Sequence, residues 1–266
     1  MRAFNPPPGT LPRRNPLRRA GATALATLLA AAGGAAAAEG TCRSQSGTAA
    51  TPLVELYTSE GCNSCPAADR WLSKLAANPG VVTLAFHVDY WDRLGWKDRF
   101  ASPAFTQRQA AQRAVNGARF SYTPQVVVDG VDRTDWPGLN PAAPRPASGA
   151  APVQLTLARD GDRERYQASV RPTAGAPRRL AAYWALTESA HVSVVKAGEN
   201  DGATLHHEAV VRELLPVAEW TSRADRPAEL VFQPATAADP KHGRRVNLVV
   251  VDAATGRPLQ AAQLAC

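Results

Sequence analysis

The chain has 266 residues and a formal net charge of +7, from 30 basic and 23 acidic side chains. Five of the arginines and none of the acids fall in residues 1–38, so residues 39–266 carry 25 basic and 23 acidic side chains, a net charge of +2. This balance gives no basis for a protein that binds nucleic acid or a membrane through its charge. Residues 39–266 are numerous enough for one or two domains with a sizeable hydrophobic core.

Residues 1–38 have the pattern of an export signal. Four arginines between residues 13 and 19 precede a stretch rich in alanine and leucine over residues 20–32, and small residues follow as far as Ala38. A charged, then apolar, then small-residue order is typical of a signal peptide, and the apolar part is too short to span a bilayer. We therefore expect a signal peptide cleaved after Ala38, a periplasmic or secreted protein, and no stable membrane span in the mature chain.

Two of the four cysteines lie near the ends of that mature chain. Cys42 follows the expected cleavage site, and Cys266 is the last residue of the sequence. Because exported proteins fold in oxidising compartments, we expect a structural disulfide between Cys42 and Cys266. The alternative, two free thiols, is more typical of cytosolic proteins.

The other two cysteines stand in the stretch LVELYTSEGCNSCPAADRWL, residues 53–72. Residues 53–57 have the composition of a strand, and the helical spacing after Cys65 accommodates Pro66 in a first turn. A strand, a turn and a helix that starts on C-x-x-C are the layout of a thioredoxin-type redox site. Free N–H groups and the helix dipole favour a thiolate at Cys62, and Cys65 can then resolve a mixed disulfide.

Two other interpretations of this C-x-x-C remain open, an inert disulfide and half of a zinc site. Structural zinc needs four ligands, which normally include a second close pair of Cys or His. The sequence offers no such cysteine pair, since Cys42 and Cys266 lie far apart, and its one His doublet, His206-His207, is about 140 residues away.

The next segments extend the α/β pattern. Residues 81–88 predict a buried parallel strand, and residues 89–96 a loop whose aromatic side chains could line the thiols. A helix is expected from Ser102-Pro103 to Asn116-Gly117. The β-branched run after Pro124 predicts another strand, which Asp129-Gly130 connects to an edge strand through a hairpin turn.

These segments carry a resemblance. Val54 to Thr58, Cys62 and Thr123-Pro124-Gln125 resemble the active-site and cis-proline segments of glutaredoxins. More closely, the sequence resembles a bacterial family of predicted secreted thioredoxin-like proteins of unknown function. The motifs are ELYTSEGCNSCPAAD, HVDYWDRLGWKDRFASPAFTQRQ, YTPQVVVDG and GENDGATLHHEAVVREL. The resemblance implies that Pro124 is cis and packs against the sulfurs, and that the Thr123 backbone is extended to pair with a substrate peptide.

The sequence departs from the glutaredoxin pattern after Gly130. Residues 131–137 replace the Gly-Gly and acidic motif that holds glutathione, so we expect no glutathione site and no cofactor. The closing helix is also missing, and prolines interrupt residues 136–152, which are typical of a linker.

From Val153 the sequence is typical of short β-strands, predicted at Val153–Leu157, Tyr166–Val170, Leu180–Leu186, Val192–Lys196, Leu205–Leu214, Leu230–Gln233 and Val246–Asp252. We therefore predict an α/β thioredoxin-like domain over residues 39–135, a linker over 136–152 and a small all-β, sandwich-like domain over 153–266. The turn Gly198–Gly202 is either an exposed hairpin or a segment that brings Glu199 and His206 near the thiols.

The sequence favours an enzyme, an exported thiol–disulfide oxidoreductase that acts on protein or small-molecule thiols and disulfides. Cys62 is the expected nucleophile and Cys65 the resolving thiol, while Thr123 and Pro124 shape the substrate groove. Glu55 is a candidate buried acid for proton transfer to Cys65, although strand alternation can turn it to the other face.

Two alternatives belong to other classes. In the first, the two thiolates bind Cu(I) in a metallochaperone-like protein, with His87 or His206 as a third ligand. In the second, the chain is a non-catalytic module that binds a partner through its all-β part.

Overall fold

The computed structural model describes residues 42–140, 149–161 and 163–266. The expected signal peptide and the middle of the expected linker lie outside these residues. The described residues belong to one compact unit. Among them, no helix has the length and apolar character needed to cross a bilayer.

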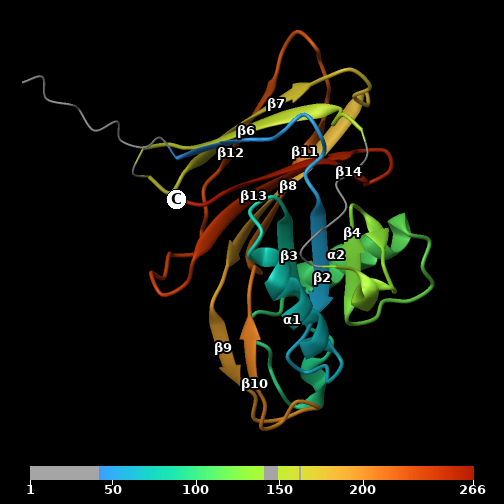
Figure 1. Cartoon of the computed structure of the whole chain (residues 1–266), viewed down its shortest axis with the longest axis vertical. Coiled ribbons are helices and arrows are strands. Elements are labelled where there is room, and N and C mark those ends of the chain that lie inside the picture. Colours follow the sequence, from blue (N-terminus) through green and yellow to red (C-terminus); the bar gives the residue numbers. More distant parts are fainter. Residues whose placement is uncertain (1–41, 141–148, 162) are drawn as a thin grey trace, which may run out of the picture. The chain divides into compact units, whose positions relative to one another are not determined.

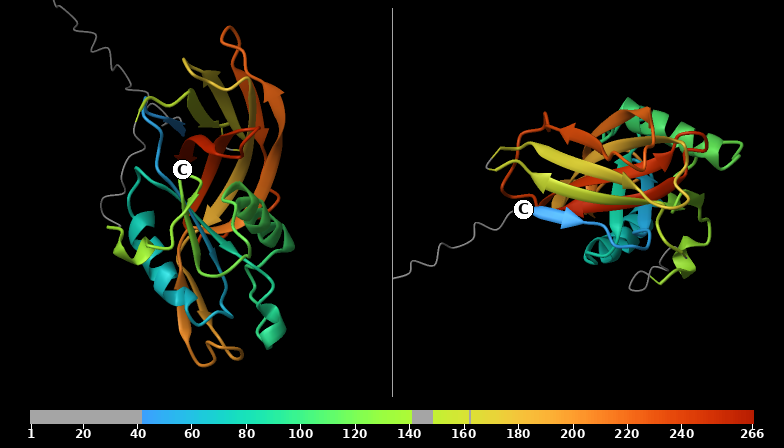
Figure 2. Two further views of the ribbon diagram at one scale, coloured as in Figure 1. Left: turned by 90° about the vertical axis from the view of Figure 1, so that its right-hand side faces the viewer. Right: turned by 90° about the horizontal axis from the view of Figure 1, so that it is seen from above.

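The fold is centred on two parallel strands, β2 (Leu53–Thr58) and β3 (Val82–His87), every residue of which is buried. Strands of this kind are covered on both faces. Helix α1 (Cys65–Ala76) covers one face and α2 (Pro103–Val115) the other (Figure 2). Side chains alternate accordingly along β2, because Val54 and Leu56 share a buried cluster with α1 and Tyr57 shares one with Phe105 of α2.

Most strands belong to one eight-stranded sheet, in the order β14-β13-β8-β11-β3-β2-β4-β5 (Figure 1). The strands that join β2 and β3 in it are β4 (Gln125–Val128), β5 (Val131–Asp132), β8 (Arg179–Glu188), β11 (Val210–Thr221), β13 (Arg244–Asp252) and β14 (Pro258–Leu264). Strand β4 pairs with β2 and β5 with β4, both antiparallel. On the other side, β11 pairs with β8 along its length and with β3 at its start.

The predicted fold class was therefore wrong. The chain does not form a thioredoxin-like α/β domain followed by a separate β-sandwich, since strands from both halves share one sheet and, among the described residues, strands far outnumber helices. The junction lies at the edge of β3, where the amide of Ala85 donates to the carbonyl of Ala209 at 2.9 Å. An uncovered edge of β3 would leave backbone groups unpaired, and β11 supplies their partners.

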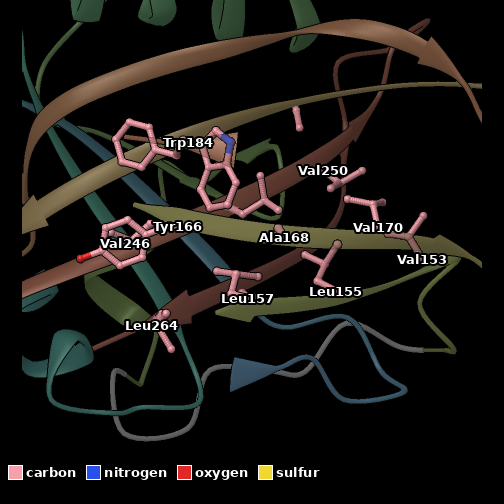
Figure 3. Packing of buried hydrophobic residues seen from close by; sticks show 14 of the residues in the cluster. Val153, Leu155, Leu157, Tyr166, Ala168, Val170, Trp184, Val246, Val250 and Leu264 are labelled. Carbon is pink, nitrogen blue, oxygen red and sulfur yellow. The ribbon is translucent and has the colours of Figure 1, made fainter. Parts of the chain in front are cut away.

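A second sheet packs against β8, β13 and β14 of the first sheet. It contains four antiparallel strands, β1 (Arg43–Gln45), β6 (Val153–Arg159), β7 (Tyr166–Pro172) and β12 (Ala228–Phe232), in the order β1-β6-β7-β12. Its inner side chains share one core with those of β8, β13 and β14 (Figure 3). Trp184 of β8 stacks on Phe232 of β12 with their ring centroids 5.6 Å apart, so large aromatic rings join the two layers.

The third sheet is a hairpin of β9 (His191–Val194) and β10 (Thr204–His207), which runs beside α1 (Figure 1). The sequence predicted one strand from Leu205 to Leu214, but the chain bends between β10 and β11. Ala190 and Ala209 both have positive φ values, 61° and 52°, and stand at the two points where the hairpin leaves the main sheet. This paired bend separates the hairpin from the strands that precede and follow it.

Within the described residues 133–140 and 149–152 after β5 there is no α-helix, in agreement with the sequence. A short 3₁₀ helix, η2 (Trp136–Gly138), follows instead, and another, η1 (Asp92–Leu94), follows β3. Trp136 packs edge-on against Trp71 of α1, with their centroids 5.7 Å apart.

The disulfide predicted between Cys42 and Cys266 is confirmed. It joins residues 224 positions apart, the first just before β1 and the second just after β14.

Candidate functional site

The C-x-x-C turn stands between β2 and α1, and Cys62 and Cys65 form a disulfide there. The amide of Cys62 donates to the carbonyl of Ser59 at 3.2 Å, and the amide of Cys65 donates to the carbonyl of Cys62 at 3.2 Å. Helix α1 begins at Cys65, with Pro66 in its first turn as predicted. Cys62 is only 1% exposed and Cys65 is fully buried, so the disulfide is shielded from solvent.

The loop at the tip of the β9–β10 hairpin contacts this turn. The Asn200 side-chain amide donates to the carbonyls of Glu60, at 2.8 Å, and Cys62, at 2.9 Å. The Glu199 carboxylate accepts from the amide of Asn63 at 3.1 Å. We call residues 198–202 the hairpin loop; it is part of the thiol site.

A buried carboxylate, Glu60, lies directly before the turn. It accepts a hydrogen bond from the Trp96 indole at 2.7 Å and lies 3.2 Å from Nε2 of His207. Burial raises the pKa of Glu60, but interactions with His207, Ser193 and Trp96 outweigh that effect, so its net pKa is lowered. Of the two residues that the second interpretation of the Gly198–Gly202 turn brings near the thiols, His206 does not take part, because it is exposed while His207 on the opposite side of β10 faces inward.

A second buried pair lies behind Glu60. Nδ1 of His87 and Oδ2 of Asp98 are 2.6 Å apart, and the same oxygen accepts from the amide of Glu60 at 2.9 Å. Burial lowers the pKa of His87, but Asp98, with smaller contributions from Asp69 and Glu60, outweighs that effect, so the net pKa is raised. For Asp98, burial raises the pKa, but His87 and the backbone amides of Glu60 and Phe100 together lower it by more, so the net pKa is lowered. The His87 and His207 rings lie 5.0 Å apart and connect the two carboxylates into one network.

The His87–Asp98 pair has a defined pH dependence. A raised pKa at His87 stabilises the fold below its unfolded-state value of about 6.5, and this contribution is lost as the pH rises through the folded pKa. A lowered pKa at Asp98 stabilises the fold above about 3.9, and this contribution is lost as the pH falls through the folded pKa. The pair therefore contributes fully between these two unfolded values.

In Asp98→Asn we expect the pKa of His87 to fall below that of an ordinary histidine, because burial remains while the largest opposing charge is removed. An NMR titration of the His87 imidazole in both proteins measures this change of sign. A His87 that still titrates above 6.5 in the variant would show that Asp98 is not what holds its proton.

Asp69 is a buried acid that the sequence reasoning missed. It lies four residues after Cys65 on α1, and residues at that spacing share one helix face. Burial raises the pKa of its carboxyl, against the opposing charges of His207 and His87. The signal was available, because Asp69 interrupts the buried face of α1 next to Ala68 and Leu72.

Glu55 does not lie with the cysteines. It is fully buried on the face of β2 that carries Tyr57, away from the residues that pack on α1. Arg108 of α2 donates to Glu55 Oε1 from Nε at 3.0 Å and also from Nη2, and the Tyr183 hydroxyl donates to it at 2.7 Å. The predicted proton transfer from Glu55 to Cys65 is therefore not supported by its position.

The Thr123–Pro124 peptide bond is cis, as the resemblance implied. Nε1 of Trp91 donates to the Thr123 hydroxyl at 2.8 Å. Trp91 also lies against the C-x-x-C turn, since a β-carbon built on Gly61 would stand 3.1 Å from that of Trp91. Trp91 thus connects the Thr123–Pro124 segment to the residue just before Cys62.

No group of three or more His, Cys, Asp or Glu side chains within the described ranges is arranged to hold a metal ion. The two histidines proposed as copper ligands are placed differently, since His87 pairs with Asp98 and His206 faces solvent.

Comparisons with known proteins place the chain in a family. No curated protein matches it. An X-ray structure of an Agrobacterium tumefaciens protein is 26% identical, has a TM-score of 0.60, and aligns over 83% of this chain and 96% of that one. HBP35 of Porphyromonas gingivalis, at 15% identity and a TM-score of 0.56, aligns over 82% of this chain and 75% of its own, a likeness of fold alone. The family described as "protein of unknown function (DUF1223)" matches residues 53–251, which include the C-x-x-C turn and the hairpin loop, and the chain belongs to this family.

Proposed function

We propose that the protein is a thiol–disulfide oxidoreductase in which Cys62 is the nucleophile and Cys65 the resolving thiol. The observation that carries the proposal is the disulfide between these cysteines at the first turn of α1. Backbone N–H groups at a helix start favour a thiolate over a thiol. The Ser64 hydroxyl, 3.4 Å from Cys62 Sγ, is a further donor for that thiolate.

The reaction transfers two electrons. The Cys62 thiolate attacks one sulfur of a substrate disulfide, which breaks that bond, forms a mixed disulfide and releases the first substrate thiolate. Cys65 then loses its proton and attacks Cys62 Sγ, which releases the second substrate thiolate and forms the Cys62–Cys65 disulfide. The two released thiolates take up protons, and the reverse sequence oxidises a dithiol.

Asp69 replaces Glu55 as the candidate acid for Cys65. It lies one helical turn after Cys65, is buried, and has a pKa raised by burial, which favours a carboxyl that holds and releases a proton nearer neutral pH. In this role it would accept the Cys65 proton when the disulfide closes.

Two further parts of the proposal concern location and partners. The signal-like sequence of residues 1–38 and the second disulfide, Cys42–Cys266, support an exported protein in an oxidising compartment. The partners would be protein or small-molecule thiols and disulfides. Because Cys62 is shielded in the oxidised form, a partner reaches it only when the residues that cover it move.

The test is catalysis of thiol exchange by residues 39–266. Reduction of insulin by dithiothreitol and refolding of scrambled RNase follow the two directions of the reaction. The proposal predicts acceleration of at least one of them. A protein that accelerates neither at any ratio of reduced to oxidised glutathione would contradict it.

A further inference from the structure

The hairpin loop adds a carboxylate to the C-x-x-C turn. We propose that Glu199 is a positioning residue that opposes the thiolate of Cys62 and so shifts the Cys62–Cys65 pair toward its disulfide. The inference rests on the proposed function only in that the pair must be reducible in the folded protein. The loop is the GENDG segment, residues 198–202, and none of its side chains has a role in the thiol exchange described above.

The first step is the hydrogen bond of Glu199. Its carboxylate accepts from the amide of Asn63, the residue that directly follows Cys62. A thiolate at Cys62 would draw on the same N–H groups and the same positive end of α1. The Glu199 carboxylate and the Cys62 thiolate then compete for the same N–H donors, and the repulsion between them raises the free energy of the thiolate.

The second step is the fixed position of the loop. Asn200 donates to the carbonyls of Glu60 and Cys62, so the loop is bonded on both sides of Gly61. At the base of the loop the amide of Gly202 donates to the carbonyl of Val195 at 3.0 Å, which closes the hairpin. Gly198 and Gly202 have φ values of 78° and 79°, which glycine adopts without strain. The backbone of Glu199 is therefore fixed beside the turn, and its exposed side chain is held there by the hydrogen bond from Asn63.

The third step concerns the other charges near the cysteines. Glu60 is compensated by His207 of the hairpin and by the Trp96 indole, and Asp98 by His87 of β3. Asp69 faces these histidines from α1. Glu199 instead bonds only to a neutral backbone amide in the described structure, so its charge is not offset by a paired cation.

The consequence for redox equilibrium follows from linkage. A group that stabilises the thiolate stabilises the reduced form and makes the pair a stronger oxidant, and a group that opposes the thiolate does the reverse. Glu199 should therefore make the Cys62–Cys65 pair more reducing than the helix start alone would.

Glu199→Gln tests this directly, because glutamine keeps an oxygen for the Asn63 amide and removes the charge. We expect the pKa of Cys62 in the reduced protein to fall, by at most about one unit because Glu199 is exposed and solvent screens its charge. The equilibrium with glutathione should shift toward the dithiol by up to about tenfold. Alkylation of Cys62 against pH with peptide mapping gives the first value, and alkylation after acid quench gives the second.

Asp201→Asn is the matched control, since it removes the same charge from the same loop and Asp201 is exposed like Glu199, but the described structure gives Asp201 no hydrogen bond to the C-x-x-C turn. It should shift both quantities much less than Glu199→Gln. Glu199→Ala, which removes both contact and charge, should lower the pKa of Cys62 as well, and urea unfolding verifies that each variant is folded.

An unchanged pKa and equilibrium in both Glu199 variants, or an equal shift in Asp201→Asn, would overturn the inference. These measurements need no turnover. A wild type that is inactive toward insulin and RNase would reject the proposed function and leave this test intact, while an active wild type with unshifted Glu199 variants would reject only the role of Glu199.

Discussion

Arg108→Met is expected to lower the free energy of unfolding by about 3–5 kcal/mol, because it leaves Glu55 as a buried charge without its cation. Glu55 is 0% exposed and accepts two hydrogen bonds from Arg108 and one from Tyr183. Glu55 lies on β2, Arg108 on α2 and Tyr183 on β8. The hydrogen bond between Tyr183 and Glu55 therefore also joins the two halves of the large sheet. The Arg108 guanidinium additionally stacks on the Tyr183 ring, 3.8 Å from its centroid.

Urea unfolding of wild type and variant measures this loss. Arg179→Met is the matched control, since Arg179 pairs with Glu219 at the surface and should contribute at most about 1 kcal/mol. A double variant, Glu55→Leu with Arg108→Met, should recover part of the loss because it removes the unpaired charge. A loss in Arg108→Met no larger than that in Arg179→Met would show that Glu55 tolerates burial without its partner.

Cys62→Ser and Cys65→Ser are both expected to reduce insulin turnover to the uncatalysed rate, but for different reasons. Cys62→Ser lacks the nucleophile and forms no mixed disulfide. Cys65→Ser keeps the nucleophile and lacks the resolving thiol, so a mixed disulfide between Cys62 and the substrate should accumulate.

Non-reducing gels and peptide mapping distinguish the two variants. The control, Cys42→Ser with Cys266→Ser, should retain turnover because neither cysteine belongs to the C-x-x-C turn, Cys42 lying just before β1 and Cys266 just after β14. Mixed disulfides on Cys65 in the Cys62→Ser protein, or full turnover in either single variant, would contradict the assigned roles.

The local parts of the site could be predicted from the sequence because short-range patterns determine them. Cys62, Cys65 and Pro66 lie within one turn, and their spacing places the disulfide at the start of a helix. The buried character of β2 and β3 and the start of α2 at Ser102-Pro103 follow from hydrophobic runs and capping in the same way.

The pairing of strands could not be predicted, because the edge of β3 and the start of β11 are more than 120 residues apart in the chain. The residues around Ala209 resembled the middle of one strand, and nothing in their composition indicated a bend at positive φ. The separate β-sandwich was inferred from strand spacing alone, which does not distinguish a new sheet from the extension of an existing one.

Long separation in the sequence also explains why the contact of the hairpin loop with the C-x-x-C turn could not be predicted. Asn200 reaches the C-x-x-C turn from the tip of a hairpin nearly 140 residues away, so no local pattern reveals its contact with Cys62. Glu55 illustrates the opposite case, since the alternation that turns it away from α1 is present in the sequence, with Val54 and Leu56 on the other face.

The reversible redox state of the Cys62–Cys65 pair is the most direct test of the proposed function. Folded protein is equilibrated in glutathione buffers of graded ratio, quenched with acid, alkylated and mapped. The proposed function predicts that Cys62 and Cys65 change together between disulfide and dithiol, reversibly and with one midpoint, while Cys42–Cys266 stays oxidised at that midpoint. A Cys62–Cys65 disulfide that is reduced only when the protein unfolds, or only together with Cys42–Cys266, would contradict it.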